Sequence, residues 1–319
     1  MDTKAGKVGI VGTGLIGAGW AAFYASKGFA VSLFDAEASA RQAGRERTLT
    51  YLAFLREHGL LDPEDHDRAV AGVEVTDDLS EAVEGARLVQ ESVTERYDVK
   101  KNVLRQIDRA AAPEAILASS SSGLLISELQ TVMERPGRSL IAHPFNPPHL
   151  IPLVELVPGK QTAPKVLAEA KTLFESLGKV PVVLNKEVPG HIANRLQAAV
   201  WREAIDLVLK GVASVADVDK ALAFGPGIRW ALLGPHMIFH LGGGPGGIKH
   251  FIDQVGVSWE KLWTDMACWT SLPAETTDAL VSGLEEEAGD RPLQEIARWR
   301  DEKVVQLLNV KASTTFVPR

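Results

Sequence analysis

Short apolar runs alternate with amphipathic stretches along the first part of the chain. The runs are rich in Val, Ile and Leu and predict buried strands over residues 7–11, 30–34, 87–90, 115–118, 140–142, 153–157 and 180–184. Helical spacing of apolar positions predicts helices over residues 16–27, 38–58, 99–110 and 165–177, with a short helix after Pro63. Strands that alternate with helices of this length are typical of βαβ units. We therefore predict an α/β fold with a doubly wound, Rossmann-type, mainly parallel sheet.

The pattern changes at Val188-Pro189-Gly190, beyond which almost no strand signal is visible. Residues 191–210 and 293–308 carry helical spacing, and Ser214-Val-Ala-Asp217 predicts a capping box at the start of another helix. The glycine cluster at 242–247 follows no strand, so we predict a loop between helices there rather than a phosphate cradle. The sequence thus predicts an α/β domain over residues 1–188 and a smaller all-α domain over residues 189–319.

Composition and charge narrow the class of protein. The chain has 319 residues, enough for two domains, and 45% of them are hydrophobic, which suffices to fill the cores. Lys plus Arg total 34 against 41 for Asp plus Glu, the net charge is −7, and no basic run is present. An acidic chain of this kind is a poor match for a phosphate backbone, so we expect no nucleic-acid partner.

The sequence carries no signal for a disulfide, a metal site or a membrane segment. Cys268 is the only cysteine, which excludes an internal disulfide and a cysteine zinc cluster. His236 and His240 are spaced to share a helix face, but no third ligand accompanies them, so we predict no metal site. The first residues lack the apolar core of a signal peptide, and no apolar stretch is long enough to span a membrane. We expect a globular protein of the cytoplasm.

The glycine motif Gly12-Thr13-Gly14-Leu15-Ile16-Gly17 lies between a predicted strand and a predicted helix. Such glycines permit a tight turn and a close approach of the backbone to a pyrophosphate, and the helix N-terminus supplies free N–H groups. A flexible turn would explain the glycines alone, but Asp35 ends the second predicted strand at the spacing that the motif requires. A carboxylate there accepts hydrogen bonds from ribose hydroxyls and repels a 2′-phosphate. The motif therefore predicts a dinucleotide site that favours NAD over NADP.

One carboxylate interrupts the aliphatic strand at 153–157. Glu155 stands there among four aliphatic residues, and a buried charge is costly unless it is paired. His143, at the end of the strand at 140–142, is the candidate partner, and a proline-stiffened loop follows it at 144–148. Ligands of doubly wound sheets bind at this carboxyl edge, where a His held by a Glu can act as a general base. A buried ion pair without chemistry is the alternative interpretation.

Polar residues of two further segments are predicted near the same edge. Ser119-Ser120-Ser121-Ser122 follows the strand at 115–118, and one of these hydroxyls is placed to donate to a substrate oxygen, unless the serines only cap the next helix. Asn194 lies near the start of the first helix of the all-α domain. A hydrogen bond at the start of that helix is its alternative role, and the spacing alone leaves both interpretations open.

Together these motifs resemble those of the L-3-hydroxyacyl-CoA dehydrogenase superfamily. The resemblance rests on the glycine motif, the four serines, His143-Pro-Phe-Asn-Pro-Pro148 with Glu155, and Pro189-Gly-His-Ile-Ala-Asn-Arg195, and it covers nearly the whole chain. It implies an NAD-dependent oxidation of the 3-hydroxyl of a small L-3-hydroxy acid by a homodimer. It further implies catalytic roles for Ser122, His143, Glu155 and Asn194, and positions near the nicotinamide end of the cofactor for Glu95 and Lys100.

Two branches of the superfamily that act on free hydroxy acids resemble the chain better than the CoA enzymes do. One comprises L-carnitine 3-dehydrogenases, and the other comprises L-gulonate 3-dehydrogenases with their lens relative lambda-crystallin. Residues 227–231 resemble both branches, whereas residues 243–251 and Ile192-Ala193 resemble the carnitine branch. The resemblance thus favours oxidation of L-carnitine to 3-dehydrocarnitine. Gulonate oxidation, a short-chain L-3-hydroxyacyl-CoA dehydrogenase and a catalytically silent, crystallin-like protein stay open as alternatives.

A carnitine substrate would require a site for its trimethylammonium group, which aromatic faces attract through cation–π contact. Phe145 follows His143 by two residues, so we expect its ring close to the reacting carbon. Arg229 and Trp230 lie side by side in the all-α domain, where Arg229 is placed to meet the substrate carboxylate. These three are the candidate substrate-binding residues. Packing in a core or in a dimer interface is the alternative role of the aromatic residues.

Overall fold

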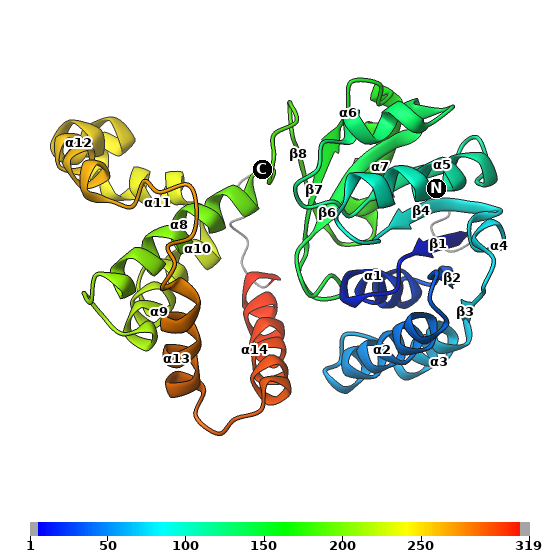
Figure 1. Ribbon diagram of the computed structural model, residues 1–319, viewed down its shortest axis with the longest axis horizontal. Helices are drawn as coiled ribbons and strands as arrows, with labels where there is room; N and C mark the ends of the chain where they lie inside the picture. Colours follow the sequence, from blue (N-terminus) through cyan, green and yellow to red (C-terminus); the bar gives the residue numbers. More distant parts are fainter. Residues whose placement is uncertain (1–5, 313–319) are drawn as a thin grey trace. The chain divides into compact units, whose positions relative to one another are not determined.

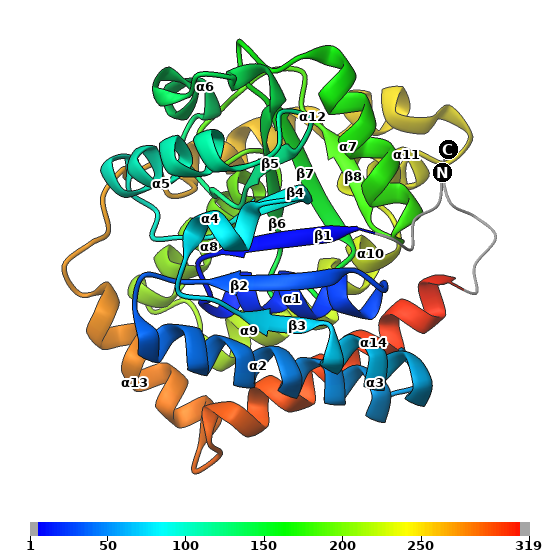
Figure 2. The same ribbon diagram turned by 90° about the vertical axis from the view of Figure 1, so that its right-hand side faces the viewer.

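One sheet of eight strands organises the N-terminal part of the computed structural model, which describes residues 6–312 (Figures 1 and 2). The strands lie in the order β3-β2-β1-β4-β5-β6-β7-β8, and neighbouring strands run parallel except for the antiparallel pair β6 and β7. Their bounds are β1 (Lys7–Val11), β2 (Ala30–Phe34), β3 (Val73–Val75), β4 (Ala86–Glu91), β5 (Ile116–Ser119), β6 (Ser139–Pro144), β7 (Leu153–Pro158) and β8 (Val180–Val183). The predicted doubly wound, mainly parallel sheet is confirmed.

Helices cover both faces of this sheet. On one face, α4 (Leu79–Val83), α5 (Tyr97–Ala110) and α6 (Ile126–Leu129) pack on buried strand residues that include Val11, Val89 and Leu117. On the other face, α1 (Leu15–Ser26) contacts α2 (Ala38–Glu57) and α3 (Pro63–Ala71). Trp20 of α1 also lies against Phe174 of α7 (Pro164–Ser176), with the ring centroids 5.8 Å apart. Two 3₁₀ turns, η1 (Gln130–Val132) and η2 (Pro136–Arg138), complete the connection to β6.

Two short elements of this sheet layer were absent from the sequence-based prediction. β3 has three residues, of which only Val73 is buried, so it carries no repeat that a pattern could detect. α4 has five residues, and the Asp78 side chain caps it by accepting a hydrogen bond from the Ser80 N–H at 2.7 Å. Elements this short are formed by tertiary packing rather than by their own sequence periodicity.

The residues after 194 are helical, with no strand in the part of this region that the structure describes. The helices are α8 (Ala193–Leu209), α9 (Val215–Phe224), α10 (Pro226–Leu232), α11 (Pro235–Gly242), α12 (Gly247–Asp265), α13 (Thr276–Ala288) and α14 (Leu293–Ala312). Ser214 caps α9 as predicted, because its hydroxyl accepts the Asp217 N–H at 3.1 Å. The glycine cluster joins α11 to α12 through the 3₁₀ turn η3 (Gly244–Gly246). This agrees with the predicted connection between two helices.

The chain divides into two compact units after Asn194, whereas the sequence pattern places the division after residue 188. The segment between these positions belongs to the N-terminal unit, because the backbone N–H groups of Ile192 and Ala193 donate hydrogen bonds to Glu155 on β7. Within residues 6–312, no helix has the length and apolar character needed to cross a membrane.

Candidate active site

The glycine motif forms an open cradle between β1 and α1. Gly12 has a φ of +94°, and a Cβ there would lie 2.6 Å from the Ser92 backbone. A Cβ on Gly17 would lie 1.9 Å from the Gly12 carbonyl oxygen, so the helix and the strand meet too closely for any side chain. A Cβ on Gly14 would meet nothing within 4 Å, and no side chain caps the start of α1. Leu15 and Ile16 begin that helix, and its free N–H groups fit the pyrophosphate of a dinucleotide.

Asp35 lies directly after β2, and its carboxylate is fixed at the entrance of this cradle. One carboxylate oxygen accepts the Thr13 N–H at 2.9 Å and the Thr13 hydroxyl at 3.3 Å. The guanidinium of Arg41 donates to the Asp35 backbone carbonyl at 2.7 Å and leaves the carboxylate without a cationic partner among these contacts. Within residues 6–312, the second carboxylate oxygen accepts one hydrogen bond, from the Glu37 N–H at 3.3 Å. This arrangement fits a carboxylate that accepts hydrogen bonds from ribose hydroxyls.

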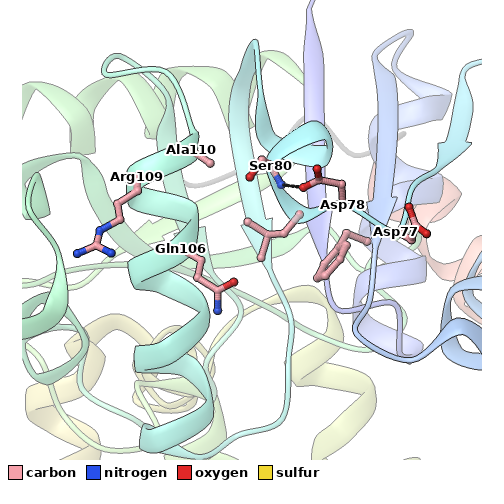
Figure 3. A pocket seen from close by; sticks show the side chains of 8 residues that line it. Asp77, Asp78, Ser80, Gln106, Arg109 and Ala110 are labelled. Atoms are coloured by element: carbon pink, nitrogen blue, oxygen red, sulfur yellow. Dashed lines mark hydrogen bonds between the residues drawn. The ribbon is translucent and has the colours of Figure 1, made fainter.

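An open hollow of about 770 Å³ lies beside the end of β2, on the α4 and α5 side (Figure 3). Phe34, the residue before Asp35, forms part of its wall, with Asp77, Asp78, Gln106 and Arg109 around it. None of its lining residues belongs to the His143 and Glu155 cluster. The hollow therefore does not include the candidate catalytic residues, and Phe34 is its one connection to the segment around Asp35.

His143 and Glu155 face each other across the one antiparallel pair of the sheet. The register of β6 and β7 places them directly opposite, and His143 Nδ1 lies 2.8 Å from a Glu155 carboxylate oxygen. Their side chains are only 5% and 1% exposed, so the contact is shielded from water. The structure thus brings together the two residues that the sequence analysis paired.

The second carboxylate oxygen of Glu155 accepts the backbone N–H groups of Ile192 at 2.8 Å and Ala193 at 3.0 Å. Burial alone would raise the pKa of Glu155, but the hydrogen bonds from His143 and from these two N–H groups hold it below its usual value. Glu155 is therefore ionised and fixes the proton of His143 on Nδ1. His143 Nε2 is left with a lone pair, as a general base requires.

The four serines after β5 have distinct environments. The hydroxyls of Ser119, Ser120 and Ser121 bond to Glu91, Gln90 and Glu95, whereas Ser122 is exposed. None of the four caps α6, which begins at Ile126 after Leu125, so the helix-capping interpretation is wrong. Ser122 is the member of the run whose side chain is accessible to a substrate.

Glu95 holds the backbone of this serine loop. One of its carboxylate oxygens accepts the N–H groups of Ser122 at 2.8 Å and Gly123 at 2.9 Å, together with the Ser121 hydroxyl at 2.6 Å. Burial raises the pKa of Glu95, but these hydrogen bonds and the Lys100 charge lower it below its usual value. The Glu95 carboxylate is thus part of the scaffold that shapes the loop around Ser122.

Lys100 is buried beside two carboxylates. Its side chain is 1% exposed, and its ammonium lies 2.7 Å from a Glu91 carboxylate oxygen and 3.4 Å from a Glu95 carboxylate oxygen. The structure thus places Lys100 next to Glu95, and a position of both near the nicotinamide end of the cofactor stays a prediction.

Asn194 approaches the serine loop from the first turn of α8. Its side-chain amide donates to the Ser122 carbonyl at 3.4 Å, and it directly follows the two residues that bond Glu155. Ser122, His143, Glu155 and Asn194 are thus joined through one set of contacts at the carboxyl edge of the sheet.

Phe145 lies beside this cluster, whereas two other predicted residues belong to the C-terminal unit. The Phe145 ring meets His143 edge to face, with the ring centroids 5.2 Å apart. Arg229 and Trp230 lie on α10, where Arg229 is exposed and the buried Trp230 Nε1 has no hydrogen-bond partner among the described residues. Roles for both in substrate binding stay predictions.

Lys179 is buried between α1 and the loop that joins β6 to β7, and the sequence analysis missed it. Its buried ammonium donates to the Ile151 carbonyl at 2.8 Å, in the loop that joins β6 to β7, and lies 4.9 Å from the centre of the Trp20 ring on α1. Burial lowers the pKa of Lys179 to about 7. A lone lysine between a helix and a strand is typical of the surface, so no sequence signal indicated its burial.

His191 was also missed by the sequence analysis. Its ring centroid lies 5.1 Å from that of His143, and its side chain is buried. Among the described residues, the two imidazoles do not form part of a metal site. Within residues 6–312, no group of three or more His, Cys, Asp or Glu side chains is arranged to hold a metal ion.

Two family models match the chain. Residues 7–188 match the 3-hydroxyacyl-CoA dehydrogenase NAD-binding domain, and residues 190–281 match the C-terminal domain of the same enzymes. The chain therefore belongs to the 3-hydroxyacyl-CoA dehydrogenase family of NAD-dependent oxidoreductases. The predictions of this family, of an enzyme and of NAD as the cofactor are confirmed.

Named relatives are similar over most of the chain. L-carnitine dehydrogenase of Streptomyces coelicolor is 41% identical over 302 residues, which are 95% of this chain and 93% of that protein. L-carnitine dehydrogenase of Pseudomonas putida is 38% identical over 304 residues, which are 95% of this chain and 93% of that protein.

Solved structures of related dehydrogenases share the fold. The 5-formyl-3-hydroxy-2-methylpyridine 4-carboxylic acid 5-dehydrogenase, described as an NAD⁺-dependent dismutase, superimposes with a TM-score of 0.78 at 29% identity, over 96% of this chain and 98% of that chain. The (S)-3-hydroxybutyryl-CoA dehydrogenase of Ralstonia eutropha superimposes with a TM-score of 0.64 at 28% identity, over 89% of this chain and 94% of that chain.

Proposed function

We propose that this protein is an NAD-dependent dehydrogenase that oxidises the 3-hydroxyl of L-carnitine to give 3-dehydrocarnitine. The observation that carries the proposal is the match to proteins named L-carnitine dehydrogenase, at 38–41% identity and over nearly their full length. The contacts among His143, Glu155, Ser122 and Asn194 support it, because they supply the base and the polar groups that such an oxidation needs. A location in the cytoplasm belongs to the same proposal.

In this proposal, each residue of the cluster has one task. His143 Nε2 takes the proton of the substrate hydroxyl, and the ionised Glu155 stabilises the imidazolium that forms. The Ser122 hydroxyl and the Asn194 amide hold the reacting oxygen. NAD, when bound, supplies the chemistry of hydride acceptance. The glycine cradle and Asp35 bind the cofactor, and Glu95 keeps the loop around Ser122 in place.

A substrate comparison tests the proposed function. The purified protein is incubated with NAD and, in turn, with L-carnitine, L-gulonate, 3-hydroxybutyrate and 3-hydroxybutyryl-CoA, and formation of NADH is recorded. The proposal expects the highest kcat/KM with L-carnitine. A higher value with gulonate or the CoA ester would transfer the proposal to that substrate, and turnover of none would favour a catalytically silent protein.

Cofactor preference depends on Asp35. The unmutated enzyme should use NADP poorly, because the 2′-phosphate would face the Asp35 carboxylate. The substitution Asp35→Ala should reduce the ratio of kcat/KM for NAD over NADP by roughly 10- to 100-fold, the effect of losing a hydrogen bond to a charged group. Initial rates with both cofactors measure this ratio, with Asp67→Ala on α3 as the control. Equal use of NAD and NADP by the unmutated enzyme would contradict the placement.

Recognition of the ammonium group is assigned to Phe145. The substitution Phe145→Ala should raise KM for carnitine by about 2- to 30-fold, the range expected for one cation–π contact. The KM for 3-hydroxybutyrate, which has no ammonium group, should change less. Phe145→Leu keeps most of the volume but lacks the aromatic face, so it should resemble the alanine variant with carnitine. Equal losses with both substrates would show that Phe145 only packs against His143.

The C-terminal unit is proposed to pair with a second copy of itself. Among its described residues, the only buried apolar side chains beyond glycine and alanine are Ile205, Val215 and Val305, too few for a core of this size. Large apolar side chains remain exposed, among them Phe224 at 77%, Trp263 at 62% and Leu293 at 76%. Sedimentation equilibrium should give twice the chain mass of 34.4 kDa. A monomer at all concentrations would contradict the homodimer.

A further inference from the structure

His191 contacts or supports three of the proposed active-site residues. It lies in the turn before α8, is 1% exposed, and has a φ of +52°, the only positive value among the described non-glycine residues. Gly190 before it has a φ of +76°, so two consecutive residues adopt the left-handed conformation. This turn directs the next two N–H groups, those of Ile192 and Ala193, onto the Glu155 carboxylate.

One hydrogen bond of the His191 ring defines its tautomer. Its Nε2 lies 3.0 Å from the Ser121 backbone carbonyl. A carbonyl oxygen only accepts hydrogen bonds, so the proton of the neutral ring resides on Nε2. Nδ1 is buried and has no partner among the described residues. The one N–H group of the neutral ring is therefore the group that holds the Ser121 carbonyl.

The neighbours of His191 connect it to both parts of the proposed cluster. The ring centroid of His143 is 5.1 Å away. Glu155 directs one carboxylate oxygen to His143 and the other to the two N–H groups after His191. The Ser121 hydroxyl donates to Glu95, whose carboxylate also lies near the Lys100 ammonium. His191 thus lies between the serine loop and the pair formed by His143 and Glu155.

We propose that His191 is a positioning residue that functions only as the neutral Nε2–H tautomer. It links the carbonyl of Ser121, next to Ser122, to the turn that bonds Glu155, and it packs against His143. This inference rests on the proposed roles of His143 and Glu155.

Two substitutions test this inference. In His191→Phe and His191→Asn, kcat should fall roughly tenfold through loss of the Ser121 contact, while the Kd for NAD stays unchanged. Asn tolerates the left-handed backbone, and Phe retains a ring against His143. A thermal melt of both variants distinguishes this loss from unfolding.

Several outcomes separate this inference from the proposed function. An unchanged kcat in both folded variants, or a loss of NAD binding equal to the loss of kcat, would overturn it. If His143→Ala retains full activity, the proposed role of His143 fails as well. If His143→Ala is inactive while both His191 variants match the unmutated enzyme, only the inference about His191 fails.

The tautomer itself can be measured in the unmutated enzyme, so this measurement does not depend on the folding of a variant. NMR of the protein with isotope-labelled histidine should show a neutral ring for His191, with the proton on Nε2 and none on Nδ1, near neutral pH. A His191 ring that is cationic there, or that carries its proton on Nδ1, would overturn the inference.

Discussion

Replacement of His143 by alanine should lower kcat by roughly 10²–10⁴-fold, the usual contribution of a positioned acid–base group. The substitution removes Nε2, the proposed proton acceptor, while the glycine cradle and Asp35 are untouched. The Kd for NAD should therefore change little. Steady-state kinetics with L-carnitine, together with titration of NAD by fluorescence, measures both quantities. His66→Ala on α3 is the matched control and should retain the activity of the unmutated enzyme.

Two results would oppose this account of His143. Turnover within a few-fold of the unmutated enzyme would show that another group accepts the proton. A loss of NAD binding equal to the loss of kcat would show that His143 supports the cofactor site instead. A thermal melt of the variant distinguishes either result from unfolding.

The substitution Glu155→Gln should lower kcat to a similar extent, although it replaces only one carboxylate oxygen by an NH₂ group. The N–H groups of Ile192 and Ala193 both donate to one carboxylate oxygen, so the amide oxygen of a glutamine must take that position. The amide NH₂ group then faces His143 Nδ1, which is forced to accept a hydrogen bond. The imidazole proton moves to Nε2, and the base is lost. An analogous carboxylate-to-amide change in a catalytic triad costs about 10⁴-fold in kcat, and we expect a loss of roughly 10²–10⁴-fold here.

Glu175→Gln, an exposed carboxylate on α7 that pairs with Lys171, is the matched control and should leave kcat unchanged. The Glu155→Gln variant should bind NAD with the affinity of the unmutated enzyme, and its activity should not recover at high pH, because the tautomer rather than the proton count is wrong. Recovery of full activity above neutral pH would contradict this explanation. Activity close to that of the unmutated enzyme at all pH values would show that Glu155 does not orient His143.

Much of the proposed cofactor-binding segment could be predicted from the sequence, because its residues are close together along the chain. The strand, the glycine turn, the helix and Asp35 are consecutive, and the structure places them within a residue or two of the predicted bounds. The pairing of Glu155 with His143 was also predictable, because a single carboxylate in an aliphatic strand needs a partner. The antiparallel register that places the two side chains opposite each other was not visible in the sequence.

The environments of Lys100 and His191 depend on long-range contacts. A lysine in an amphipathic helix is typical of the surface, yet Lys100 is buried because Glu91 and Glu95 both reach it from the segment around the end of β4. His191 adopts a conformation that favours glycine, and no sequence pattern indicates it. Neither environment could be predicted without knowledge of which segments meet at the carboxyl edge of the sheet.

Transfer of a labelled hydrogen tests the central claim most directly. L-carnitine that carries deuterium on carbon 3 is incubated with the purified enzyme and NAD, and the NADH that forms is analysed by mass spectrometry. We predict that the deuterium of carbon 3 appears in NADH, with 3-dehydrocarnitine as the second product, and that His143→Ala slows the transfer in proportion to its loss of kcat. NADH without deuterium, or no reduction of NAD by L-carnitine, would contradict it.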